Sequence, residues 1–172
     1  MEQLNKTTEH KQNLPQSPLV EVTRTFRASV ERVWNAWSNA ELVKQWWGPN
    51  AFTAPDAKTD FRVGGKYLFA MKDTNGKVTW SGGNYQEIVP NKKIVTLDYF
   101  ADANGNMISA KEAGLPGEWP NELYVTVEFE SLNPEQTKMT ISHEGIPKDM
   151  HDDCVQGWSE SIDKLQKLVE RN

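Results

Sequence analysis

The histidine at position 143 is the side chain in this sequence best suited to acid–base chemistry. It lies in the segment "SHEG", at the end of a predicted strand, on the same strand face as Met139 and Ile141. A histidine there can transfer a proton if a partner lies within hydrogen-bonding reach, and Tyr85 and Glu87 are the candidates for accompanying groups. The alternative is a buried histidine whose hydrogen bonds serve only the fold. The sequence leaves both interpretations open.

Metal and nucleotide sites are not indicated. The chain has three histidines, at positions 10, 143 and 151, and no pair of cysteines, so it offers no metal-ligand spacing. It contains no G-x-S-x-G, no P-loop and no G-x-G-x-x-G motif. We therefore expect neither a metal nor another cofactor.

The remaining reactive side chains have plain structural explanations. Cys154 follows two acidic residues, whose charges raise a thiol pKa, so we interpret it as an unreactive helix residue. Glu87, Asp98 and Glu128 lie on predicted strands. Because charged side chains are mostly exposed, we expect all three to face solvent on the convex side of a sheet.

Aromatic side chains supply most of the material for a binding site. In "ELVKQWWGPNAF", Trp46 and Trp47 precede a Gly-Pro stop at the end of a predicted helix, and their spacing from Leu42 and Val43 directs both indoles inward. They are expected to anchor the core first and to form pocket walls second. The full set of predicted ligand-binding residues is Trp46, Trp47, Tyr67, Phe69, Met71, Trp80, Tyr85, Tyr99, Trp119, His143 and Trp158.

Helices and strands must bring these residues together. Residues 19–26 alternate as a strand, and two short helices follow, one capped by Ser29 and one with a capping-box pattern at Ser38 and Glu41. Further strands are predicted over 66–71, 77–89, 93–100, 122–130 and 137–145, joined mostly by hairpin turns.

The last segment, 152–172, has apolar residues at spacings of three and four, which predicts a long amphipathic helix. Its apolar stripe is the natural partner for the apolar face of the sheet. The expected fold is α+β, with one long helix across a curved antiparallel sheet. Such an arrangement can leave a space between helix and sheet.

The connection over 101–121 is longer than most loops in compact domains. It carries Leu115 and Trp119 between prolines, and a disordered loop would rarely expose such apolar side chains. We hypothesise a lid whose Leu115 and Trp119 fold over the mouth of the pocket. The alternative is a loop packed on the outer side of the sheet.

Composition narrows the class of protein. The net charge of -5, with lysines interspersed, does not provide the basic stripe that a nucleic-acid binder needs. No apolar run approaches the ~20 residues that span a bilayer, and no signal peptide is recognisable. We expect a cytoplasmic protein with no membrane or nucleic-acid partner, which is a monomer or a homodimer. Residues 1–18 are expected to form a disordered tail, and residues 19–172 to form one domain.

Six segments resemble, in order, the signatures of one superfamily. They are "VERVWNAWSNAELVKQWWGP", "DFRVGGKYLFAM", "SGGNYQEIVPNKKI", "VTVEFE", "TKMTISHEGIP" and "GWSESIDKLQKLV". Together they are similar to the SRPBCC (START-like) superfamily, in the branch named for the activator of the 90-kilodalton heat-shock protein ATPase, over residues 19–170. The resemblance implies a helix-grip fold, with a six- or seven-stranded sheet wrapped around a long C-terminal helix and an apolar cavity between them.

Members of that superfamily include small-molecule binders, cyclase-like enzymes and co-chaperone domains, so the fold does not decide the function. Three functions stay open: a binder of an apolar or aromatic small molecule, an enzyme acting on such a molecule, and a co-chaperone-like module with a chaperone partner. We favour the binder, because no convincing catalytic set is assembled. Relatives often carry a histidine four to six residues before the Gly-Trp of the last helix; here His151 lies six before Gly157.

Overall fold

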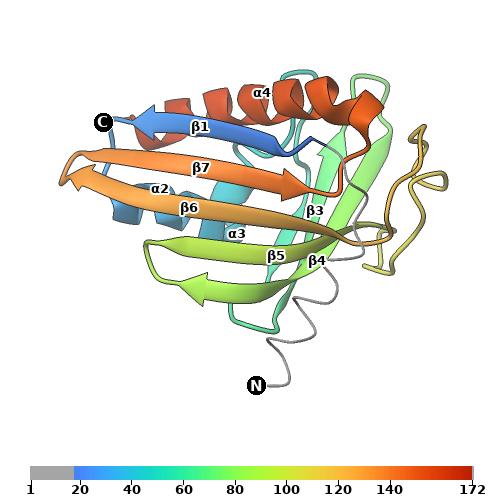
Figure 1. Ribbon diagram of the computed structural model, residues 1–172, viewed down its shortest axis with the longest axis horizontal. Helices are drawn as coiled ribbons and strands as arrows, with labels where there is room; N and C mark the ends of the chain where they lie inside the picture. The colour runs from blue at the N-terminus through green and yellow to red at the C-terminus, as the bar shows by residue number, and fades with distance from the viewer. Residues whose placement is uncertain (1–17, 172) are drawn as a thin grey trace.

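The chain folds around one curved antiparallel sheet. The computed structural model describes residues 18–171, so the predicted tail lies almost entirely outside the described residues. The sheet has seven strands in the order β1-β7-β6-β5-β4-β3-β2, all neighbours antiparallel (Figure 1). The strands are β1 (Val20–Phe26), β2 (Ala57–Thr59), β3 (Lys66–Lys72), β4 (Val78–Val89), β5 (Lys93–Ala101), β6 (Leu123–Asn133) and β7 (Gln136–Glu144).

Two of the three α-helices in the described part of the chain follow β1 directly. The first is α2 (Val30–Ser38), and Ser29 caps it by accepting a hydrogen bond from the backbone N–H of Arg32, as predicted. The second, α3 (Ala40–Val43), is shorter than predicted and is capped by Asn39, since Ser38 still belongs to α2. Its backbone continues as turns through Trp46. A helix this short depends on tertiary contacts for its stability.

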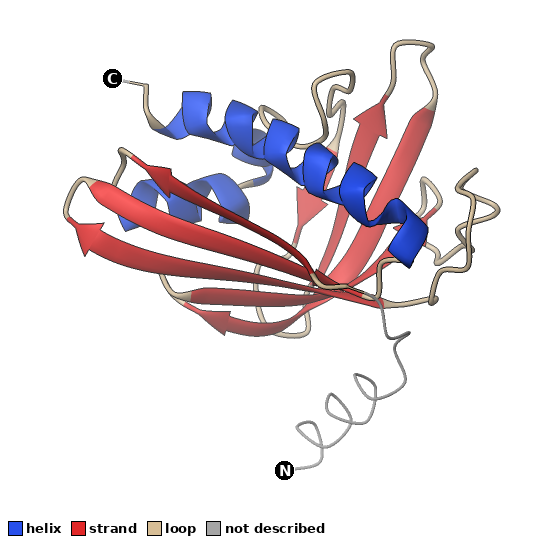
Figure 2. Cartoon of the chain, turned by 45° about the horizontal axis from the view of Figure 1, so that its top comes forward, coloured by secondary structure: helices blue, strands red, loops and turns tan. Residues whose placement is uncertain are grey.

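The long C-terminal helix α4 (His151–Val169) follows a 3₁₀ turn, η1 (Lys148–Met150). It crosses one face of the sheet, and the strands curve around it (Figure 2). Ile162, Leu165 and Val169 are buried, so the predicted apolar stripe is in contact with the core. Helix α2 packs into the same cluster through Val33 and Trp37. The observed architecture is the expected helix-grip fold.

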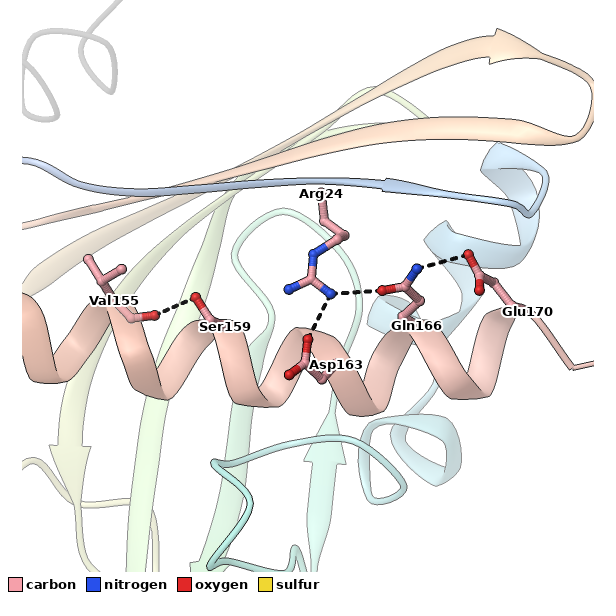
Figure 3. Close-up of polar contacts among 6 residues, drawn as sticks. All are labelled: Arg24, Val155, Ser159, Asp163, Gln166 and Glu170. Carbon is pink, nitrogen blue, oxygen red and sulfur yellow. Dashed lines mark hydrogen bonds and ion pairs between the residues drawn. The ribbon is translucent and has the colours of Figure 1, made fainter.

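The N-terminal edge of the sheet is tied to α4 by polar contacts. Arg24 on β1 donates hydrogen bonds from Nη1 to Asp163 Oδ1 and to Gln166 Oε1, each at 2.8 Å (Figure 3). Gln166 in turn donates to Glu170 at 3.1 Å. Such half-exposed contacts add little stability, so their main effect is to fix where α4 lies along β1.

None of the helices in the described part of the chain is both long and apolar enough to cross a membrane.

Candidate functional site

A pocket of about 320 Å³ lies between α4, the concave face of the sheet and the loop that precedes β6. Aromatic and aliphatic side chains form most of its surface, and a few polar groups interrupt them. This volume falls at the lower end of the range of about 300–1,000 Å³ found for small-molecule sites. It is about twice the ~150 Å³ known to accommodate benzene.

Nine of the eleven residues predicted to bind a ligand line this pocket. They are Trp47, Tyr67, Phe69, Met71, Tyr85, Tyr99, Trp119, His143 and Trp158. Those on strands, apart from Tyr99, share the concave face because side chains two residues apart point to the same side. Tyr99 follows Asp98, so its side chain points to the opposite face, beside Gly82. The segments are distant in sequence, and the curvature of the sheet brings them together.

The two adjacent tryptophans have different positions. Trp46 lies outside the pocket lining; it is fully buried and donates a hydrogen bond from Nε1 to the carbonyl of Ala36 at 2.9 Å. Trp47 is half-buried and forms the pocket wall, 4.9 Å from Phe69 and 5.7 Å from Trp158 between ring centroids. Trp46 therefore has the core role that was expected first, and the prediction that it also forms the pocket wall is wrong.

The Gly-Pro stop fixes Trp47 against α4. Gly48 has φ +95°, a conformation that side-chain-bearing residues rarely adopt. Lys164 on α4 donates from Nζ to the carbonyls of Pro49 and Phe52 at 3.2 and 3.3 Å. These bonds hold the turn, and with it the indole of Trp47, over the pocket.

A row of residues across three strands builds the polar end of the pocket. Tyr67 on β3, Gly83 on β4 and Asp98 on β5 are cross-strand neighbours. The tyrosine ring passes over Gly83, and its hydroxyl donates to Asp98 Oδ1 at 2.7 Å. Neighbouring strands lie about 4.8 Å apart, so a side chain on β3 must reach across β4 to contact β5. Tyr67 can do so because Gly83 has no side chain in its way.

Gly83 is therefore expected to be intolerant of substitution. A Cβ at this position meets the Leu97 carbonyl oxygen at 2.2 Å and the Tyr67 hydroxyl at 2.5 Å. We expect Gly83→Ala to lower the free energy of unfolding by about 2–3 kcal/mol, because a well-packed site resists added atoms. Urea denaturation measures this. Gly157→Ala in α4 is the control: its nearest heavy atom, Pro49 Cγ, is 3.5 Å away, so an unchanged or raised stability is expected. Equal losses in both variants contradict the explanation.

His143 lies in the next row of the sheet, directly opposite Val125. Trp158 on α4 donates from Nε1 to His143 Nδ1 at 3.1 Å, so this nitrogen is the acceptor and the neutral ring carries its proton on Nε2. Nε2 is buried and has no hydrogen-bond partner among residues 18–171. It lies 3.8 Å from Asp98 Oδ2, which is too long for a hydrogen bond.

Burial controls the ionisation of three side chains at the polar end of the pocket: Asp98, His143 and Cys154. It raises the pKa of Asp98 from 3.8 to about 7, against the opposing effects of the hydrogen bonds from the Tyr67 hydroxyl and the Tyr99 backbone. It lowers the pKa of His143 from 6.5 to about 4. Burial, and secondarily the charge of Asp98, raises the pKa of Cys154 to about 12. At neutral pH the histidine is uncharged and the thiol is protonated.

These values correct two sequence-based interpretations. Asp98 was expected to face solvent, but its side chain is only 20% exposed and lines the pocket. Cys154 has the raised pKa that was predicted, but the main cause is burial and not the neighbouring acids. Its Sγ lies 3.8 Å from His143 Nδ1, on the pocket lining.

Two other predicted candidates lie away from the pocket. Trp80 neighbours Ser81, whose side chain lines the pocket; because successive strand residues alternate, Trp80 points to the opposite face. Glu87 is exposed and pairs with Lys93 at 3.4 Å. A bulge between Tyr85 and Glu87 shifts the register, so the two residues do not share a face as simple alternation predicts.

Tyr85 lines the pocket, but its hydroxyl is already bonded to Thr59 Oγ1 at 2.6 Å. Burial raises its pKa to about 12. The three weak catalytic candidates His143, Tyr85 and Glu87 therefore do not form one set of interacting groups. The acidic residue Asp98, which sequence reasoning missed as a site residue, has its Oδ2 atom 3.8 Å from His143 Nε2.

The long connection before β6 contributes to the same pocket. Leu115 and Trp119 are half-buried and both line it. Trp119 packs edge-on against Phe100 at 5.3 Å and donates from Nε1 to the carbonyl of Pro116. This placement agrees with the position expected of a lid and differs from a loop on the outer sheet. Opening and closing of the loop stays a prediction.

Within residues 18–171, no three His, Cys, Asp or Glu side chains lie close enough together to hold a metal ion.

Comparisons with known proteins agree with the geometry. Residues 27–170 match the family model described as Activator of Hsp90 ATPase homolog 1-like protein. The structure of a protein from Chromobacterium violaceum is 30% identical, covering 90% of this chain and 98% of that chain, with a TM-score of 0.71. A protein from Rhizobium leguminosarum is 27% identical, covering 90% and 95% of the two chains, with a TM-score of 0.68.

More distant structures share the fold alone. The AHSA1 protein from Silicibacter pomeroyi is 19% identical, covering 87% of this chain and 96% of that chain, with a TM-score of 0.70. A search of curated proteins found no match.

Proposed function

The chain belongs to the Activator of Hsp90 ATPase homolog 1-like family. Because a pocket lies between its long helix and its sheet, we propose that the chain binds one apolar, largely aromatic small molecule there. The observation that carries the proposal is the lining itself. A pocket of about 320 Å³ is walled by Trp47, Phe69 and Trp158, with polar groups at one end. Small-molecule sites are mostly apolar and have few polar anchors.

Aromatic walls suit this role because rings offer large contact areas with few rotatable bonds. Trp158 and Trp47 meet edge-on at 5.7 Å, and Trp158 stacks near Trp37 at 6.2 Å. Both pocket-facing indoles are thereby held by packing before any ligand arrives. A preorganised wall lowers the ordering cost of binding.

The other two functions have weaker support. A chaperone-binding module needs a contiguous exposed apolar patch. The exposed large apolar side chains of the described residues come from six separate segments of the sequence: Leu19, Val63, Val78, Val89, Met107 and Leu132. An enzyme needs a nucleophile or base with partners in reach, and His143 lacks a hydrogen bond to Asp98.

The proposal is tested by filling the pocket. Val125 is buried in the floor of the pocket between Thr96 and His143. We expect Val125→Phe to weaken binding of 2-methylnaphthalene by roughly tenfold or more, since the added ring occupies the same volume; tenfold corresponds to about 1.4 kcal/mol. Titration calorimetry measures the affinity.

The matched control is Val78→Phe, the same substitution at a strand position that is 40% exposed and outside the pocket lining. It is expected to leave the affinity unchanged. If the wild-type chain binds no naphthalene derivative, or if both variants lose affinity equally, the proposal is wrong.

A further inference from the structure

The polar end of the pocket contains a donor and an acceptor that face each other without bonding. His143 Nε2 carries a proton and is buried, with no partner among residues 18–171, and the residue as a whole is 9% exposed. Asp98 Oδ2 lies 3.8 Å away, while Oδ1 of the same carboxylate is occupied by the Tyr67 hydroxyl. Leaving a buried donor unpaired is unfavourable, because the group loses its hydrogen bond to water and gains none in the protein.

We propose that this pair recognises a neutral hydroxyl group of the ligand, an alcohol or phenol carried on an apolar body, whose oxygen bridges His143 Nε2 and Asp98 Oδ2. The inference rests on the proposed function and specifies the ligand class. A single oxygen at ordinary hydrogen-bond distance from both atoms spans a separation of 3.8 Å. It accepts from Nε2–H and donates to the carboxylate.

Other polar groups match this pair less well. A carboxylate group places a second negative charge beside Asp98. A carbonyl accepts from His143 but has no proton for Asp98, and an ammonium group has none of the lone pairs that His143 requires. A hydroxyl supplies one donor and acceptor lone pairs, so it satisfies both side chains. Water has the same capacity, and a ligand hydroxyl can replace it without leaving either group unpaired.

The surrounding residues hold both groups in place. The indole of Trp158 fixes the orientation and the tautomer of His143. Tyr67 fixes the carboxylate of Asp98, and Gly83 leaves room for the tyrosine ring. The aromatic walls then receive the apolar body, and a pocket about twice the size of a benzene-binding cavity admits two fused rings.

The test compares three ligands of one shape: 2-naphthol, 2-methylnaphthalene and 2-naphthoate. Titration calorimetry is performed at pH 8, where Asp98 is mostly ionised. We expect 2-naphthol to bind roughly 10- to 100-fold more tightly than 2-methylnaphthalene, because hydrogen bonds to charged groups are stronger than neutral ones and unpaired groups are penalised. The binding of 2-naphthoate is expected to be the weakest.

Two variants locate the effect. Asp98→Asn removes the acceptor charge, and His143→Asn removes Nε2 while retaining an acceptor for Trp158. Each is expected to reduce the preference for 2-naphthol to within about threefold of 2-methylnaphthalene, because the hydroxyl then lacks one of its two partners and the charged acceptor or the buried donor is gone. Glu87→Gln, a carboxylate-to-amide change at an exposed strand position, is the control and is expected to retain the full preference.

The outcomes separate the two proposals. If 2-naphthol and 2-methylnaphthalene bind the wild-type chain equally, the hydroxyl inference is wrong while the proposed function stands. If none of the three binds, both are wrong. A preference that persists in both variants, or tighter binding of 2-naphthoate, also overturns the assignment. The ligand series in the wild-type chain decides the question even where a variant does not fold.

Discussion

Replacing Trp46 with alanine is expected to lower the free energy of unfolding by about 3–5 kcal/mol, a large part of the ~5–15 kcal/mol that stabilises a typical domain. Trp46 has no exposed surface, and its ring lies 4.7 Å from Trp37 and 5.5 Å from Trp47. Truncation leaves a void among these rings and removes the donor to the Ala36 carbonyl. Urea denaturation followed by circular dichroism measures the loss.

The neighbouring residue provides a matched control with the same change of side chain. Trp47 is half-buried on the pocket wall, and its Nε1 has no hydrogen-bond partner among residues 18–171. Trp47→Ala is expected to cost less than about 2 kcal/mol, because the space it vacates joins an existing pocket. It should instead weaken ligand binding. Equal losses of stability in the two variants contradict the division into core and pocket residues.

The different positions of Trp46 and Trp47 show what the sequence can and cannot predict. The helical spacing of Trp46 and Trp47 correctly predicts that both residues belong to an apolar side of the chain. It cannot predict that the helix ends at Val43, because a four-residue helix is decided by what it packs against. The turn that follows sends one indole into the core and the other into the pocket.

The strands and the long helix were predictable because their apolar patterns are strong. On β6, Leu123, Val125 and Val127 lie two residues apart on one face of the sheet, and all three are buried, as predicted. The three-residue strand β2 was not identified, since a segment this short carries no readable period. The bulge that turns Glu87 outward leaves no reliable sequence signal either.

Asp98 shows the same limit at the candidate site. Strand β5 has apolar residues on both faces, including Ile94 and Val95, so alternation does not indicate which face is inward. One signal was available: the Gly82-Gly83 pair opposite β5, which permits large side chains to lie across β4. Only the register reveals that Tyr67 uses this space to reach Asp98.

The buried Asp98 and His143 are expected to give opposite dependences of stability on pH. Asp98 has a pKa of about 7 in the folded chain and an ordinary value of 3.8, so between these limits the folded state binds more protons than the unfolded state. Its contribution to stability therefore falls as pH rises from about 4 to 7. The difference corresponds to roughly 4 kcal/mol, since one pKa unit is equivalent to about 1.4 kcal/mol.

His143 acts in the other direction. Its pKa is about 4 in the folded chain and ordinarily 6.5, so the unfolded state binds more protons and stability rises with pH over that window. Tyr67 and Cys154, which face the same carboxylate, have raised pKa values and remain neutral throughout. The two effects largely cancel in the wild-type chain between pH 4 and 6.5.

Single substitutions should expose each effect. Relative to wild type, Asp98→Asn is expected to have similar stability at pH 4 and to be more stable by about 2–4 kcal/mol at pH 8, because the amide is never charged. His143→Asn should show the reverse, gaining most at pH 4. Urea denaturation of the three proteins at intervals of half a pH unit measures both. An Asp98→Asn difference that does not change with pH means that the carboxylate ionises as it does in water, and the polar end of the pocket is then more hydrated than its geometry indicates.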